Sequence, residues 1–226
     1  MISKKYFLLT VLLVLTASIF TSCNDDDDND ASRYYPDAVV TIKQVNGQTI
    51  FQLNDSTRLY PVNLTPSTFV KEVRAFVNYR PAKDNEIKDK DMKNVYVNWV
   101  DTIRTKNMAE DKGTENNKLY GNDRLEIVND WMTVCEDGYL TLRMRTYFSP
   151  GVVHYVNLVK GAEPYEVVLH QDARGDTISG RPGDAIMAFR LDKLPDTKGK
   201  YVDLTLKYRS FSGEKSIKFK YRTRNQ

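Results

Sequence analysis

The sequence predicts an all-β protein in which a small barrel is followed by an antiparallel β-sandwich. Hydrophobicity alternates with a period of two along most of the chain beyond its N-terminal segment. Turn-forming pairs such as Asn46-Gly47 separate the alternating segments. No segment of twelve or more residues carries an apolar stripe with helical spacing, so we expect little helix.

Residues 1–22 have the pattern of a lipoprotein signal peptide. Two lysines precede an uncharged run at 6–20 that is too short to span a bilayer comfortably. Small residues stand immediately before Cys23, so we expect Cys23 to become the N-terminal residue and its acylated thiol to anchor the chain to a membrane. The alternative is an ordinary secretory signal, with Cys23 forming a disulfide with Cys135.

Residues 23–36 are expected to form an acidic tether. Five aspartates lie between positions 25 and 30, and they leave little apolar surface to bury. Acidic residues at this place resemble the surface-export signal of outer-membrane lipoproteins in Bacteroides-type bacteria. We therefore expect an outer-membrane lipoprotein at the cell surface, or otherwise one that faces the periplasm. The alternative is that the aspartates are only a solvated spacer.

Residues 37–105 are predicted to form the barrel. Alternation and turn signals divide this region into five short strands. The predicted strands are 38–45, 49–53, 57–62, 72–80 and 95–105. Five strands in so short a region are typical of a small closed barrel.

Residues 106–123 are polar with two glycines, and we interpret them as a linker between domains. The sandwich is then expected over 124–226, with about seven strands. Segments 139–148, 201–208 and 216–222 show the clearest alternation, each with one apolar and one polar face.

Several stretches of the sequence also match a known family. They are YYPDAVVTIK, VRAFVNYR, VYVNWVDTIRTK, EDGYLTLRMRT, HYVNLV, VVLHQDARGD and FRLDKLPDT. Together, and in this order, they resemble the NigD-like lipoproteins. The resemblance implies an N-terminal OB-like barrel and a C-terminal β-sandwich. The founding member is associated with a bacteriocin gene cluster, which implies an immunity role, but the family has no established activity.

The charge balance and the lack of catalytic motifs exclude several classes of function. Without the two leader lysines and five tether aspartates, residues 31–226 hold 31 Lys+Arg and 25 Asp+Glu, a mildly basic balance without clustering, so we expect no nucleic-acid partner. No nucleophile elbow, zinc-protease motif, phosphate loop or Cys-x-x-Cys pair occurs. Cys135 is followed by two acidic residues that disfavour a thiolate, and is interpreted as a buried residue. We expect no enzyme activity and no cofactor.

Two histidines and one triplet are further candidate sites. His154 and His170 lie on neighbouring predicted strands, and a metal site would require Asp172 or Asp176 as a third ligand. Isolated histidines in a sandwich are more often framework residues, so no metal is expected. The Arg-Gly-Asp triplet at 174–176 is interpreted as a turn rather than an adhesion motif.

The candidate ligand-binding face consists of outward basic residues of the sandwich. These are Arg143, Arg145, Lys218, Lys220 and Arg222. On adjacent strands they would form one basic face suited to an anionic glycan. The alternative is a solvated sheet face whose lysines protect an exposed edge.

The function expected from the sequence is therefore non-catalytic binding of a macromolecular partner, either a glycan or a surface protein, by a lipoprotein of the cell envelope. A bacteriocin immunity protein is the first alternative, and an enzyme of unknown class the second. The sequence gives no indication of oligomeric state.

Overall fold

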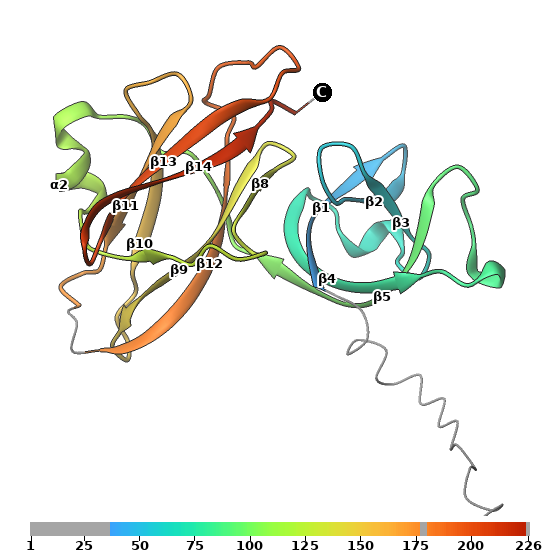
Figure 1. Ribbon diagram of the computed structural model, residues 1–226. Coiled ribbons are helices and arrows are strands. Elements are labelled where there is room, and N and C mark those ends of the chain that lie inside the picture. The colour runs from blue at the N-terminus through green and yellow to red at the C-terminus, as the bar shows by residue number, and fades with distance from the viewer. Residues whose placement is uncertain (1–36, 177–179, 225–226) are drawn as a thin grey trace, which may run out of the picture. The chain divides into compact units, whose positions relative to one another are not determined.

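The computed structural model describes residues 37–176 and 180–224 (Figure 1). The predicted signal peptide, Cys23 and the acidic tether lie outside the described residues. Within that part of the chain, no helix combines the length and apolar character needed to cross a bilayer.

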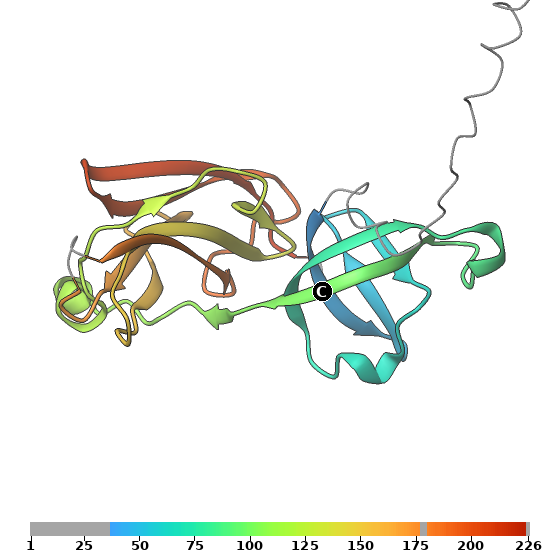
Figure 2. The ribbon, with the colours of Figure 1, turned by 90° about the horizontal axis from the view of Figure 1, so that it is seen from below.

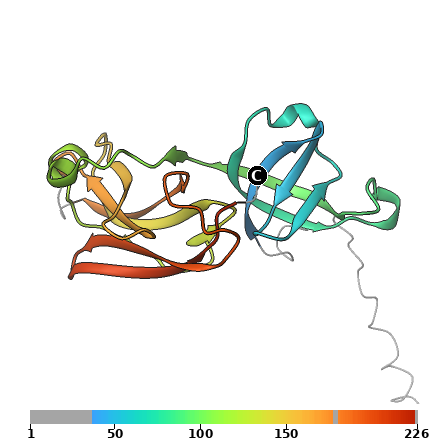
Figure 3. The ribbon, with the colours of Figure 1, turned by 90° about the horizontal axis from the view of Figure 1, so that it is seen from above.

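An N-terminal barrel forms as predicted. Its strands, among the described residues, are β1 (Asp37–Val45), β2 (Gln48–Gln52), β3 (Arg58–Pro61), β4 (Val73–Pro81) and β5 (Lys93–Ile103). They close in the order β1-β2-β3-β5-β4 (Figures 2 and 3). The β1–β2 hairpin turns at Asn46 and Gly47, whose φ angles of 51° and 78° explain the Asn-Gly pair.

Each barrel strand presents one face to the barrel core and one to the outside. Val40, Ile42, Phe51 and Val77 are fully buried in the core. Because the side-chain period is two, their neighbours on β1, β4 and β5 point outward. One outward face of the barrel, which includes Val39 and Ile103, is also buried.

The second domain is a β-sandwich. Its described strands are β6 (Thr105–Asn107), β7 (Glu126–Ile127), β8 (Val134–Glu136), β9 (Tyr139–Phe148), β10 (Tyr155–Lys160), β11 (Glu166–Asp172), β12 (Arg181–Arg190), β13 (Val202–Ser210) and β14 (Gly213–Tyr221). One sheet has the order β10-β11-β13-β14, and the other has the order β6-β12-β9-β7, with β8 paired to β9. The pairings β11–β13 and β6–β12 are parallel, whereas an antiparallel sandwich was predicted.

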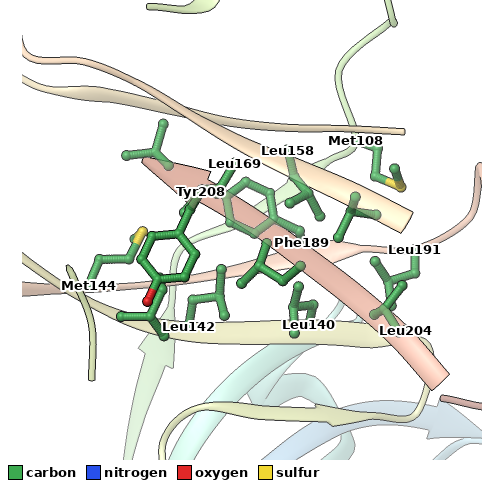
Figure 4. Close-up of a cluster of buried hydrophobic side chains, with 14 of the residues drawn as sticks. Met108, Leu140, Leu142, Met144, Leu158, Leu169, Phe189, Leu191, Leu204 and Tyr208 are labelled. Carbon is green, nitrogen blue, oxygen red and sulfur yellow. The ribbon is translucent and has the colours of Figure 1, made fainter. Parts of the chain in front are cut away.

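The sandwich core lies between the two sheets. Leu140, Leu142 and Met144 of β9 pack against residues such as Leu158 and Leu204 from the opposite sheet (Figure 4). All five are less than 3% exposed. Burial of these side chains, at about 25 cal/mol per Å² of apolar surface, is the main force holding the sheets together.

The predicted linker at 106–123 is wrong, because this segment belongs to the sandwich. Strand β6 pairs with β12, and Met108 is 3% exposed within the sandwich core. Helix α2 (Asn116–Tyr120) packs on β11 (Figure 1). Three short 3-10 turns, Pro66–Thr68, Asp84–Glu86 and Gly113–Glu115, complete the described helical elements.

Candidate functional site

Arg143 and Arg145 point outward from β9, as the alternation predicts, but both are neutralised. Asp184 on β12 is the cross-strand partner of Arg145 and binds it with an Nε–Oδ1 distance of 2.6 Å. Arg143 binds both Asp184 and Asp130. The hydrogen bond from Arg145, with a further one from Arg143, lowers the pKa of Asp184 to about 2. This part of the predicted basic face therefore offers little unpaired charge.

The prediction that the five basic residues share one face is wrong. Lys218 and Lys220 are on β14, which pairs with β13 in the other sheet. Because the core lies between the sheets, the outer face of β14 points away from that of β9. Lys220 pairs with Asp203 at 2.6 Å. Arg222 lies beyond the end of β14.

The side chain of Arg222 contacts the barrel. Its Nη2 donates to the carbonyl of Asp55 at 3.2 Å, and its guanidinium stacks on Tyr201 at 4.8 Å from the ring centroid. Asp55 belongs to the connection between β2 and β3. Arg222 therefore joins the two domains rather than extending a basic sheet face.

An outward face of the barrel forms the junction with the sandwich. Val39 on β1 and Phe76 on β4 are register partners, and Ile103 ends β5 on the same side of the barrel. They form an apolar cluster with Ala188 and Ile186 of β12. We call the contact region between barrel and sandwich the junction.

Beside this apolar contact, the junction contains charged groups arranged around the buried ring of Tyr139. The ring of Tyr139 is fully buried, and its hydroxyl donates to Glu72. Arg224 also donates to both oxygens of Glu72 at 2.9 Å. The guanidinium groups of Arg74, Arg190 and Arg224 lie 5.0 to 5.6 Å from the Tyr139 ring centroid. Sequence reasoning missed this cluster, because its members are far apart along the chain.

Glu72 is held as a carboxylate by this cluster. Burial by itself would raise its pKa, but the hydrogen bonds from Tyr139 and Arg224 outweigh burial, and the pKa is lowered. The same hydrogen bond, added to burial, raises the pKa of Tyr139 to about 12. Tyr139 therefore remains a hydrogen-bond donor at neutral pH.

Arg74 is the largest fully buried side chain in the described residues. Its Nη1 donates to Thr41 at 2.9 Å, and its Nη2 has no hydrogen-bond partner among the described residues. Burial lowers its pKa to about 10, so it is still a cation at neutral pH. A buried charge of this kind is costly, and Asp137 is its main electrostatic compensation.

A polar cavity opens at the junction, with a volume of about 320 Å³. Its charged lining groups are Lys43, Arg58, Arg222, Arg224, Asp55 and Asp137. Lys43 binds Asp137 at 2.7 Å, and Asp137 also receives Arg224 at 3.1 Å. We call this cavity the junction pocket.

Both tryptophans of the chain are exposed at the edge of the junction. Trp131 contacts the ring of Phe76 edge-on, with centroids 5.7 Å apart. Trp99 is paired with Asn78 on the same outward side of β4 and β5 as Phe76. Trp99 is 38% exposed and Trp131 is 47% exposed. We call these three aromatic residues, Trp99, Trp131 and Phe76, the tryptophan rim.

The two histidines have separate hydrogen-bond partners. Nε2 of His154 lies 3.0 Å from Asp176, and its Nδ1 lies 3.2 Å from the amide of Gln171. His170 contacts the carbonyl of Gly121 at 3.0 Å. No group of three potential metal ligands occurs in the part of the chain that the structure describes.

The Arg-Gly-Asp triplet and Cys135 are occupied within the fold. Arg174 and Gly175 form a turn with positive φ angles, and Asp176 accepts hydrogen bonds from Ser149. Cys135 packs against the sandwich core, and burial, more than the nearby Asp55, raises the pKa of its thiol. Arg174 is exposed at this turn, but Asp176 is engaged by Ser149, and the thiol of Cys135 lacks the activation that nucleophilic attack would require.

A second cavity, of about 330 Å³, lies on the sandwich between β9 and β11. Asp123 in its lining accepts the backbone N–H of Ala173 at 2.7 Å. Arg209 donates to the carbonyl of Asn122 at 2.8 Å. These lining groups are therefore engaged in holding loops of the sandwich.

Comparisons with known proteins agree with this architecture. Residues 39–103 match the NigD-like N-terminal OB domain, and residues 107–221 match the NigD-like C-terminal beta sandwich domain. No curated protein matches the sequence.

Several solved structures of Bacteroides and Parabacteroides proteins are similar to the chain. A protein of Parabacteroides distasonis described as toxin-related is 30% identical, with a TM-score of 0.70, over 83% of this chain and 93% of that one. A NigD-like immunity protein of Bacteroides caccae is 16% identical, with a TM-score of 0.55, over 81% and 91%. A Bacteroides fragilis protein described as a lipoprotein is 12% identical, with a TM-score of 0.54, over 84% and 99%. The last two likenesses concern the fold alone.

Proposed function

Because the chain belongs to the NigD-like family, we propose that it is a non-catalytic binding protein of the cell envelope that takes a protein partner at the tryptophan rim. The observation that carries this proposal is the exposure of Trp131, which contacts Phe76, and of Trp99, which lies on the same outward side of β4 and β5 as Phe76. Exposed tryptophans are unfavourable in water unless a partner covers them, and tryptophan is enriched among the residues that dominate protein interfaces.

The surroundings of the rim support a protein rather than a glycan. Neither tryptophan lines the junction pocket or the sandwich cavity. Asn78 donates to Asp37 at 2.9 Å and accepts from Asn98 at 2.6 Å. The side-chain amides of Asn78 and Asn98 are therefore already hydrogen-bonded within the protein. Fewer polar groups beside the rim are left to bind sugar hydroxyls.

Immunity against a bacteriocin is the specific form of this function that the comparisons favour. One similar structure is named a NigD-like immunity protein, and another is described as toxin-related. A bacteriocin is itself a polypeptide, so capture at the tryptophan rim would serve this role without catalysis. Chemistry is also disfavoured by the raised thiol pKa of Cys135.

Anchoring at Cys23 and display at the outer-membrane surface complete the proposal. They are supported by the pattern of residues 1–30 and by the similar protein described as a lipoprotein. An alkyne fatty acid should label the wild-type chain and not Cys23→Ala. Persistent labelling of that variant would show that another residue carries the lipid.

If Asp25 to Asp28 direct export, replacing them with alanine should keep the label and protect the protein from external protease, whereas unchanged cleavage would reduce them to a spacer.

The binding proposal is tested by photo-crosslinking in whole cells. A benzophenone amino acid at position 131 should give a protein adduct, and one at Leu119, which is 56% exposed on α2, should not. Trp99→Ala should remove the adduct at 131, because loss of a dominant interface tryptophan costs about 2 kcal/mol or more. Trp99→Phe should restore part of it.

Two outcomes would contradict the binding proposal. Equal adducts from positions 119 and 131 would mean that contact is unspecific. Adducts that resist protease and are cleaved by periodate would identify a glycan as the partner.

A further inference from the structure

The junction pocket carries more positive than negative charge. Among its lining residues, Lys43, Arg58, Arg222 and Arg224 are opposed by two carboxylates, Asp55 and Asp137. The next groups behind the lining do not remove the excess. Behind the lining, the two cations Arg74 and Arg190 are matched by the two carboxylates of Glu72 and Glu136.

Two of the pocket's guanidinium groups have donors left to offer. Arg58 is exposed, donates from Nε to Gln52 at 3.2 Å, and makes no ion pair with a carboxylate of the described residues. The Nε of Arg222 lies 3.7 Å from Asp55, a long separation for an ion pair. Arginine presents its donors in a planar fork that fits the oxygens of phosphate.

Lys43 carries an electrostatic cost within the pocket. Although Asp137 binds it, burial lowers the pKa of Lys43, and Arg224 lowers it further by repulsion. Glu136, whose pKa is raised by burial, is not among the lining residues of the pocket. An added anion would therefore relieve an existing electrostatic cost.

The cavity is large enough for such an anion. At about 30 Å³ per water molecule, its 320 Å³ equals the volume of about ten waters. The hydroxyl-bearing residues Ser56 and Thr223 also line it. From these observations we propose that the junction pocket binds a small oxyanion with two negative charges, such as a phosphate monoester, through Arg58 and Arg222.

The proposed site joins the two domains. Lys43 belongs to β1 and Arg58 to β3 of the barrel, whereas Arg222 and Arg224 follow β14 of the sandwich. A bound dianion would therefore stabilise the contact between the two domains. A ligand that binds only the folded state raises the free energy of unfolding by mass action. This proposal is independent of the tryptophan rim.

The test is calorimetric titration and thermal unfolding of residues 24–226 with inorganic phosphate, against sodium chloride at equal ionic strength. Phosphate should bind saturably and raise the melting temperature, whereas chloride should not. Arg58→Gln should weaken phosphate binding at least tenfold, and Arg222→Gln should do the same. Arg145→Gln, an exposed change outside the pocket, should bind as the wild type does.

Further titrations distinguish the sources of the dianion. Tighter binding of glucose 6-phosphate than of phosphate would indicate a soluble sugar phosphate. Tighter binding of a short-chain phosphatidate would indicate a lipid headgroup. Absence of saturable binding by all three, or equal phosphate binding by wild type and Arg58→Gln with both folded by thermal unfolding, would overturn the proposal.

Discussion

Arginines meet carboxylates both on the outer face of β9 and at the junction, but in different environments. On β9, Arg143 and Arg145 meet Asp184 at the surface, where solvent and salt screen the interaction. At the junction, Arg224 meets Glu72 beside a tyrosine ring with no exposed surface. The two ion pairs have similar exposed fractions, 24% and 21% for Arg143 and Asp184 against 26% and 25% for Arg224 and Glu72, but only the second pair joins two domains and shares its carboxylate with a buried tyrosine.

The largest effect should come from cutting the chain at the predicted rather than the observed domain boundary. A fragment of residues 105–226 retains β6 and Met108 and should unfold cooperatively in urea. A fragment of 124–226 loses both, together with α2, and should show no cooperative transition. Equal transitions for the two fragments would mean that residues 105–123 are a linker after all. The transition of the 105–226 fragment should be insensitive to EDTA, and its loss on adding EDTA would reveal a metal site.

Removing the central carboxylate of the junction should have the next largest effect. Glu72→Ala leaves Arg224 and Tyr139 without their shared acceptor and should lower the free energy of unfolding by about 1.5 to 3 kcal/mol. Urea unfolding measures this change. Glu214→Ala, an exposed change on β14, is the control and should leave the midpoint unchanged. Similar losses from the two variants would contradict a special role for the junction.

Acid should weaken the junction in a smaller and graded way. The lowered pKa of Glu72 means that its contribution is complete above the ordinary value of 4.5 and is lost as the pH falls through the folded-state value. The stability difference between wild type and Glu72→Gln should therefore shrink below pH 4.5. If the stability difference stayed constant down to pH 2, protonation of Glu72 would not affect the stability of the fold.

The cluster of Arg143, Arg145 and Asp184 on the outer face of β9 and β12 provides the matching control for that titration. Asp184, with a pKa of about 2 against an ordinary 3.8, should lose its contribution only between these values. Arg145→Gln should change the acid profile in that window alone, and by less than Glu72→Gln, because Arg145 is exposed. A larger change from Arg145→Gln would show that this cluster contributes more to stability than the junction does.

Local patterns were enough to predict the fold and the direction of many side chains. Alternation places Leu140 and Leu142 inward and Arg143 outward, because a pleated strand has a side-chain period of two, and the structure confirms this. Polar composition was misleading at 106–123, where the pairing of β6 and the burial of Met108 place the segment in the sandwich.

Pairings between distant strands could not be predicted in the same way. Nothing in the local pattern of β14 shows that it joins the sheet opposite β9, so Arg143 and Lys218 were assigned to one face. Glu72 and Arg224 are 152 positions apart, and their contact depends on how two domains meet. The candidate site at the junction was therefore visible only in the structure.

The central claim is that barrel and sandwich form one cooperative unit through the junction, and scanning calorimetry of residues 24–226 tests it most directly. A single heat-absorption peak is expected, and Glu72→Ala should move the whole peak to lower temperature. Two separate peaks, with only one of them moved by Glu72→Ala, would show that the domains unfold independently and that the junction does not couple them.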